Sequence, residues 1–269
     1  GSSGSSISNV QLDNLQITDM GRGWSGQRYG SEAYGIRIQA DSGAGSIDNT
    51  TINGCDINGQ ANTGIRVLGD TGVTHISKSR IRSNGDSGIR FAAPAGISSA
   101  RLLLDSSLIY NNNNDGVNFN CPDCQGLVVY HNTFYNNGSI NLGIFNQANQ
   151  ALIKNNIFYG STPMTQLYVN AALAGAEVDF NCYTDGTNMF GYNSVAYDTV
   201  AAFNTATGLE SAGSGNAAGG LLDPANGQFG LTAASACRSL GTPGTGISSD
   251  FAGLPYASPP SAGALEYQP

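Results

Sequence analysis

The chain has 269 residues, of which 11% are charged and 40% are hydrophobic, with 37 Gly and a formal net charge of −8. The negative charge argues against general nucleic-acid binding, and no apolar run is long enough to span a membrane. Charge this sparse is atypical of a helical protein, whereas the apolar content argues against disorder. The length allows one large domain or two small ones.

The chain opens with residues 1–6, GSSGSS, which have the composition of a tag or a flexible linker. A repeated pattern begins directly after it. The Gly of a recurring phrase falls at 35, 64, 88, 116 and 143, so the intervals are 29, 24, 28 and 27 residues. A period in this range is typical of solenoids, propellers and related arrays.

The phrase itself alternates apolar and polar residues, as a β-strand does. In GIRVL, Ile65 and Val67 lie on one side and Arg66 on the other. A second apolar strand precedes each phrase, in nine-residue segments that begin at 12, 52, 76, 103, 129 and 152. The first and sixth residues of these segments are apolar and are expected to face the core.

Between those apolar positions lies a row of small or amide residues. Such residues suit a tight bend, and stacked Asn side chains can hydrogen-bond along the stack. The sequence predicts this row as Cys55, Ser79, Ser106, Asn132 and Asn155, and the next corner as Asn84, Asn111 and Asn137.

Each repeat thus holds two or three short strands with polar corners and no helix. Such a unit buries its apolar face only by stacking on its neighbours, each strand pairing with the same strand of the next coil. The pattern predicts a parallel β-helix. A β-propeller is the alternative, but its period is longer and its antiparallel blades need hairpin turns.

The motif N-x(4–6)-G-I-x-I, spaced 24 to 29 residues apart, resembles the right-handed parallel β-helix superfamily, the pectate-lyase-like proteins. The resemblance covers residues 7 to about 176. It implies an all-β, single-stranded right-handed parallel β-helix of about six to seven coils with a loop-rich C-terminal cap. The motif is more specific for fold than for function, because one fold hosts many activities.

Residues 177–269 are expected to hold the last coil, a short helix and a capping segment. The helix is predicted in YDTVAAFNTATG, with Asp198 capping its start and Gly208 ending it. The ending, from SACRSLG to SAGALEY, resembles the C-terminal region of many secreted bacterial β-helix proteins, although a Pro and two Asp residues of that pattern are missing. The segment is expected to cover the last coil.

The repeat is already complete at Leu12–Ile38, yet natural solenoids cover their first coil with a capping element. We therefore expect that the first coil is not a natural end, and that either more protein once preceded residue 1 or another chain covers that end.

Five Cys residues are present. Cys121 and Cys124 form a lone CxxC, and without a second ligand pair a local disulfide or a plain loop is favoured over zinc. Cys182 and Cys237 could pair, which the sequence leaves open. Cys55, on the inward row, is expected to be a buried free thiol.

The residue two places after each phrase Gly is expected to face outward. Because adjacent coils lie about 4.8 Å apart, three arginines there would form a ladder roughly 10 Å long. Like charges in register repel each other, so either Asp41 and Asp70 or an anionic ligand would compensate them. The row is predicted to be Arg37, Arg66, Arg90, Asn118, Phe145 and Tyr168.

Two interpretations of this row stay open. One is a salt-bridged outer face with turn aspartates. The other is a groove for a polysaccharide, since the planar guanidinium binds carboxylates in a bidentate manner and the rings of Phe145 and Tyr168 can stack on sugars. An insertion between Met20 and Gly35 carries Trp24 and Tyr29, which would add to such a groove unless Trp24 covers the open end of the core.

Pectate-lyase-like proteins commonly have their sites on the face and loops of one such sheet, so the resemblance implies that any catalytic site of this chain lies on the arginine face. In a lyase, Arg66 and Arg90 would neutralise a uronate or act as the base. A hydrolase needs two carboxylates, for which Asp41 and Asp70 are weak candidates, as they are for a calcium site. No other cofactor or metal is expected. A second polar row, interpreted as surface pairing, is Lys78, Asp105, His131 and Lys154.

Together with the arginine row, the resemblance thus implies a secreted bacterial protein that acts on an acidic polysaccharide as a lyase or glycoside hydrolase. The alternative is a non-catalytic carbohydrate-binding or cell-surface adhesion β-helix. Neither nucleic acid nor membrane is an expected partner. Arg66, in the middle of the ladder, is expected to contribute most to glycan binding.

Overall fold

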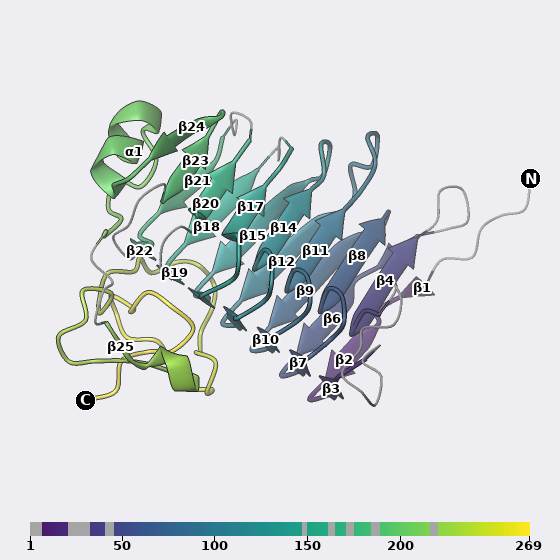
Figure 1. The fold of residues 1–269 in the computed structure, drawn as a ribbon, viewed down its shortest axis with the longest axis horizontal. Coiled ribbons are helices and arrows are strands. Elements are labelled where there is room, and N and C mark those ends of the chain that lie inside the picture. The colour runs from purple at the N-terminus through teal and green to yellow at the C-terminus, as the bar shows by residue number, and fades with distance from the viewer. Residues whose placement is uncertain are drawn as a thin grey trace, which may run out of the picture.

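The computed structural model describes residues 7–20, 33–40, 46–146, 150–160, 165–170, 175–183, 189–215 and 220–269. Stacked β-strand coils form an elongated body with the single described α-helix, α1 (Val200–Thr207), at one end (Figure 1). Strands of one coil pair in parallel with the same strands of the next. The all-β parallel β-helix predicted from the repeat is confirmed.

Three sheets form the faces of the stack within the described residues. The first sheet contains β2 (Gln11–Asp13), β6 (Thr50–Asn53), β9 (Val73–Ser77), β12 (Arg101–Asp105), β15 (Gly126–Tyr130), β18 (Ala151–Lys154) and β21 (Glu177–Asp179). The second contains β3 (Gln16–Thr18), β7 (Asp56–Asn58), β10 (Arg80–Arg82), β13 (Leu108–Tyr110), β16 (Thr133–Tyr135), β19 (Ile157–Tyr159) and β22 (Cys182–Tyr183). The third contains β4 (Ile36–Ala40), β8 (Ile65–Gly69), β11 (Ile89–Ala92), β14 (Val117–Asn120), β17 (Ile140–Ile144), β20 (Thr165–Val169), β23 (Phe190–Tyr192) and the antiparallel β24 (Val195–Tyr197). Two small sheets pair β1 (Ile7–Ser8) with β5 (Ile47–Asp48), and β25 (Leu221–Asp223) with β26 (Gln228–Leu231).

The core is built from apolar residues that stack in register from coil to coil. In the second sheet the rings of Phe134, Phe158 and Tyr183 stack at 4.9 and 5.0 Å between centroids and are fully buried. Aromatic stacking of this kind adds about 0.5–1.5 kcal/mol per pair to the area that is buried. The full inward row of this sheet is Ile17, Ile57, Ile81, Ile109, Phe134, Phe158 and Tyr183.

The corner between the first and second sheets uses one residue in the left-handed conformation, with φ between 45° and 67°. Non-Gly residues rarely adopt this conformation, and Asn tolerates it better than most. The residue that follows each left-handed residue points its side chain inward, and these side chains form a hydrogen-bonded ladder along the stack. The left-handed residues are Asn14, Gly54, Lys78, Ser106, His131, Asn155 and Phe180.

The backbone N–H of each ladder residue donates to the side-chain oxygen of the ladder residue in the next coil, at 2.9 to 3.2 Å. The predictions of Ser106 and Asn155 for this row were wrong by one residue, because Ser106-Ser107 and Asn155-Asn156 offer the same residue type at both positions. The same displacement puts Asn112, not Asn111, in the second corner row. The first ladder is Cys55, Ser79, Ser107, Asn132, Asn156 and Asn181.

Glu210 ends this ladder in the fully buried interior. Its Oε1 atom accepts from Asn181 Nδ2 and from the Tyr183 hydroxyl, both at 2.6 Å. Burial raises the pKa of Glu210 to about 7, although the hydrogen bonds from Tyr183 and Asn181 act in the opposite direction. The folded state therefore binds a proton at Glu210 in a pH range where the unfolded chain has released it.

This raised pKa predicts a pH-dependent stability. The contribution of Glu210 is fully present below pH of about 4.5 and is lost as pH rises through about 7, on the order of 3 kcal/mol in total. Urea denaturation from pH 5 to 8 should show the Glu210→Gln variant gaining on the wild type by about that amount as pH rises. Buried His131, whose burial lowers its pKa to about 4, titrates in both proteins and cancels in the comparison. A constant difference between the two proteins would contradict the assignment.

The end of the core is covered by α1, where Phe203 stacks on Phe190 at 4.4 Å. The helix ends at Gly208 in the left-handed conformation, as predicted, but its N-cap is Thr199 and not Asp198, because the Thr199 side chain accepts from the Ala202 N–H.

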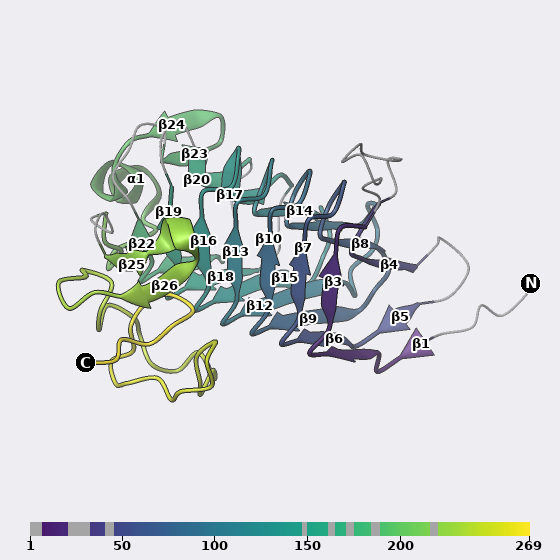
Figure 2. The ribbon, with the colours of Figure 1, turned by 60° about the horizontal axis from the view of Figure 1, so that its bottom comes forward.

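The C-terminal segment, residues 220–269, does not cover the last coil as expected. It packs on the outer face of the second sheet (Figure 2), where Phe229 and Leu231 join Leu108 and Ile157. The prediction that Leu108 and Ile157 face the core was wrong, because the apolar neighbours Ile109 and Phe158 take the inward positions. The segment also contains the 3-10 helix η1 (Pro224–Asn226).

Two disulfides are present. Cys121–Cys124 closes a local loop, as favoured over zinc, and Cys182–Cys237 joins β22 to the C-terminal segment. Cys55 is a buried free thiol, as predicted. Within the described residues, no helix has the length and apolar character needed to cross a membrane.

Candidate functional site

Three arginines stand in register on neighbouring strands of the third sheet. Arg37 on β4 pairs with Arg66 on β8, and Arg66 pairs with Arg90 on β11. All three alternate with buried apolar residues, so their side chains lie on the outer face of the sheet. The shared face predicted from their fixed offset after the phrase Gly is confirmed.

The phrase Gly itself is required by close packing between coils. A Cβ atom on Gly88 would lie 2.7 Å from the carbonyl oxygen of Gly116 and 2.8 Å from Asn112 Nδ2. Any larger residue would push adjacent coils apart. Gly-Ile therefore fixes the start of each strand, and with it the position of the arginine that follows.

Tyr34 separates two of the like charges. Its ring centre lies 5.8 Å from the guanidinium carbon of Arg37 and 4.9 Å from that of Arg66, and Arg66 Nη1 also donates to the Tyr34 hydroxyl. Arg37 donates further to Gln39 on its own strand. Cation–π contacts of this type contribute about 0.5–1 kcal/mol each at exposed sites, so the Tyr34 ring offsets part of the repulsion between Arg37 and Arg66.

Arg90 lies beside a pair of carboxyl groups at the start of the strands. Its guanidinium is 4.0 Å from Asp86 Oδ2, and nearly half of its side chain is exposed. Asp86 accepts from Thr63 Oγ1 and Asn114 Nδ2, both at 3.1 Å. This part of the face therefore combines an accessible cation with a fixed carboxylate.

The second carboxyl group belongs to Asp115, which is almost fully buried and accepts from Asn118 Nδ2 at 2.7 Å. Burial raises the pKa of Asp115, and the nearby Asp86 raises it further, whereas Asn118 and Arg90 act against the shift. Paired carboxyl groups with different environments are the arrangement that acid–base catalysis of glycosidic cleavage uses.

The predicted row is wrong at Phe145, although the ring occupies the expected place. Gly143, not Phe145, pairs with Asn118 and Tyr168. A Cβ atom on Gly143 would lie 2.6 Å from the Phe145 ring, so the ring folds back over the glycine and lies 5.4 Å from that of Tyr168. A two-residue displacement keeps the alternation of a strand, which is why the pattern did not reveal it.

The remaining predicted residues do not join this face. Asp70 accepts from Ser99, on the loop between β11 and β12, and among the described residues it is not paired with an arginine of the row. Trp24, Tyr29 and Asp41 lie outside the described residues. Among the residues that the structure describes, no group of three or more His, Cys, Asp or Glu side chains could hold a metal ion.

The second polar row is corrected by the register, which joins Ser77, Asp105, Tyr130 and Lys154 across the first sheet. Lys78 and His131 occupy the left-handed corner positions instead. His131 is buried beneath the C-terminal segment, against the ring of Tyr256 at 4.0 Å. Asp105 lies 2.5 Å from His75 Nε2, and Lys154 pairs with Glu177.

The sequence pointed to Tyr34 only as part of the insertion that leads into the Arg37 strand, and it did not point to Asp86 or Asp115 as parts of the face. A signal was available in the phrase itself, since each of them lies one or two residues before a phrase Gly. Those positions lie just before the strands of the third sheet that carry the arginines.

The chain matches the family model described as right handed beta helix region over residues 2–195. It therefore belongs to the right-handed β-helix family. A comparison with curated proteins finds no match.

Proposed function

We propose that the outer face of the third sheet binds an acidic polysaccharide, which runs along the stack across Arg37, Arg66 and Arg90. The observation that carries the proposal is the register of these arginines on consecutive strands. Coils spaced about 4.8 Å apart match the length of a sugar unit closely enough for repeated side chains to read repeated units. Asn118 and the rings of Phe145 and Tyr168 continue the same surface with groups that suit sugar hydroxyls and sugar faces.

Arg90 is the arginine that the structure favours for contact with a uronate. It is exposed and its ion pair with Asp86 is long, whereas Arg66 is partly occupied by Tyr34. Secretion remains part of the proposal, and the two disulfides support it because such bonds persist in oxidising compartments.

Replacement of Arg90 should weaken glycan binding. A charged hydrogen bond contributes about 1.5–3 kcal/mol, with surface exposure favouring the lower value, so Arg90→Ala should lose about tenfold in affinity for oligogalacturonate or oligoalginate. Isothermal titration at two salt concentrations measures this, and added salt should weaken the wild type more than the variant. Arg80→Ala is the matched control, because Arg80 is similarly exposed and also faces an Asp, but on the second sheet. Equal binding by Arg90→Ala and wild type would contradict the proposal.

Catalysis at this face is the second candidate function, and the Asp86–Asp115 pair beside Arg90 favours it. In this function Asp115 holds the proton that is given to the leaving group, and Asp86 is the base. Incubation with acidic glycans, monitored by reducing ends and by ultraviolet absorbance of unsaturated uronates, separates hydrolase from lyase. Release of neither product by the wild type would leave binding alone as the function of the face.

A further inference from the structure

The outer face of the first sheet holds a cavity of about 230 Å³ on the side of the molecule that the proposed glycan does not use. Its floor consists of Leu103, Val128 and Leu152, which stand in register on β12, β15 and β18. Thr245 and Ile247 of the C-terminal segment cover it. Outward positions elsewhere in the same row are polar, namely Thr51, His75 and Glu177.

Three aliphatic residues in an outward row need an explanation, because a sheet face that meets water normally alternates apolar-in with polar-out. The C-terminal segment accounts for part of their burial, but it leaves a hollow above them. The shape and chemistry of that hollow fit an apolar group of a few carbon atoms.

Arg101 borders this hollow at the start of β12, two residues before Leu103 and therefore on the same side of the strand. Its guanidinium makes no hydrogen bond or ion pair with any described residue, and its Nε atom is buried without an acceptor. By contrast, Arg80, Arg82, Arg90 and Lys154 each face a carboxylate. A buried donor of a charged group that lacks a partner is costly, so the site favours a ligand that supplies one.

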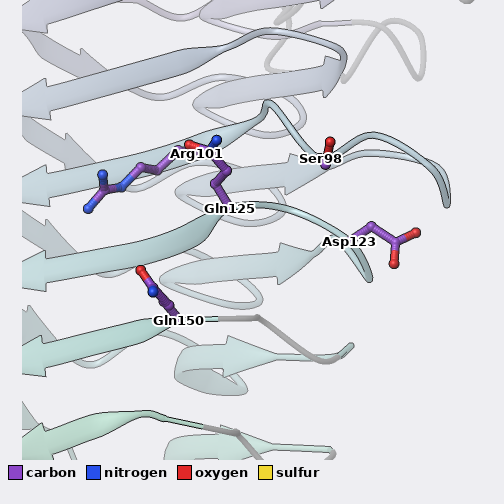
Figure 3. Close-up of a pocket in the computed structure, with 5 residues that line it drawn as sticks. All are labelled: Ser98, Arg101, Asp123, Gln125 and Gln150. Atoms are coloured by element: carbon purple, nitrogen blue, oxygen red, sulfur yellow. The ribbon is translucent and has the colours of Figure 1, made fainter.

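Arg101 lines a second hollow as well, whose residues are drawn in Figure 3. The second, of about 410 Å³, is lined by Ser98, Asp123, Gln125 and Gln150. The Arg101 side chain extends along the sheet away from Ser98 and Asp123, and Asp123 already accepts from the Gly96 N–H. Asp123, the carboxylate of the second hollow, forms no ion pair with Arg101.

Polar side chains also line the cavity away from Arg101, but they are already paired with each other and do not require a charged ligand. His75 and Asp105 are held together at 2.5 Å, and the Tyr130 side chain lies next to them. Arg101 is then the one cation of the cavity that is not paired with a described residue. A ligand with a single negative charge balances it, whereas a dianion would leave one charge against Asp105.

We propose that this cavity is a second ligand site, which binds a small organic monocarboxylate with an apolar body. The carboxylate pairs with the guanidinium of Arg101 and supplies the acceptor that Nε lacks. The apolar body lies on Leu103, Val128 and Leu152 beneath Ile247, where partial exclusion of water strengthens the charged pair. The site does not depend on the function proposed for the third sheet.

Benzoate tests this site, with benzamide as a probe of the same shape but no charge and inorganic phosphate as an anion with no apolar body. In titrations followed by ligand-observed NMR and calorimetry, benzoate should bind with a Kd of about 1 mM or tighter. Benzamide and phosphate should each bind at least about tenfold more weakly.

Arg101→Gln should weaken benzoate binding by at least about tenfold, and Leu152→Gln should weaken it while leaving Arg101 in place. Arg80→Gln is the matched control on the second sheet and should bind as the wild type does. Circular dichroism confirms that each variant is folded. The proposal is overturned if benzoate shows no saturable binding, if Arg101→Gln binds it as well as the wild type, or if phosphate binds as tightly as benzoate.

Discussion

Asn156→Ala should lower the free energy of unfolding by roughly 3–5 kcal/mol. Asn156 is fully buried in the corner ladder, between Asn132 and Asn181. Its Nδ2 donates to the Val129 carbonyl at 2.8 Å and to Asn181 Oδ1 at 2.9 Å, and its Oδ1 accepts from the Asn132 N–H at 2.9 Å. Alanine leaves these buried groups without partners, at about 1–3 kcal/mol for each group that cannot recover one.

The matched control is Asn146→Ala, which removes an amide from an exposed pair with Asn120. Its effect should stay within about 0.5 kcal/mol. Urea denaturation followed by far-ultraviolet circular dichroism gives both values. A loss for Asn156→Ala no larger than that of the control would show that the ladder does not hold the coils together.

Removal of the Cys182–Cys237 disulfide should cost about 4 kcal/mol, by the loop-closure entropy for its sequence separation of 55 residues. The bond fastens the C-terminal segment to β22, where Leu221, Phe229 and Leu231 cover the second sheet. The double Cys→Ala variant should therefore also expose residues 220–269 to proteolysis before the coils are cleaved.

The Cys121–Cys124 disulfide provides the comparison, because it closes a loop with a separation of only 3 residues. Its removal should cost roughly 2 kcal/mol on the same entropy argument. Limited proteolysis and thermal unfolding under non-reducing conditions measure the two variants side by side. Equal losses, or cleavage in the coils before the C-terminal segment, would contradict the clamping role of Cys182–Cys237.

The sequence predicted the architecture because the same structural pattern recurs in each coil. Gly before each strand reflects a close approach between coils, as at Gly88, and the alternation around Arg66 follows the pleat of a strand. Every coil restates these constraints, so an error in one does not change the fold.

Register errors arose where neighbouring residues are chemically alike. Ser106-Ser107 and Asn155-Asn156 offered two equivalent choices, and only the left-handed φ of the first residue in each pair decides between them. At Gly143 the error was two residues, which leaves the inward and outward faces unchanged.

The candidate site was only partly predictable for a different reason. The arginines share one offset in the repeat, but Tyr34, Asp86 and Asp115 reach the same face from the residues before each strand. The C-terminal segment covers the second sheet, and its residues Thr245 and Ile247 cover the cavity at Arg101 on the first sheet. Both positions depend on packing between parts of the chain that share no periodicity.

The most direct test of the central claim is the affinity of the wild type for oligogalacturonates of increasing length. If Arg37, Arg66 and Arg90 read successive units, affinity should rise with each added unit until the chain spans the ladder of about 10 Å, and then level off. The length dependence should disappear when all three arginines are replaced by Gln. Affinity that does not change with length, or a length dependence that survives the triple substitution, would contradict a polysaccharide-binding role for the third sheet.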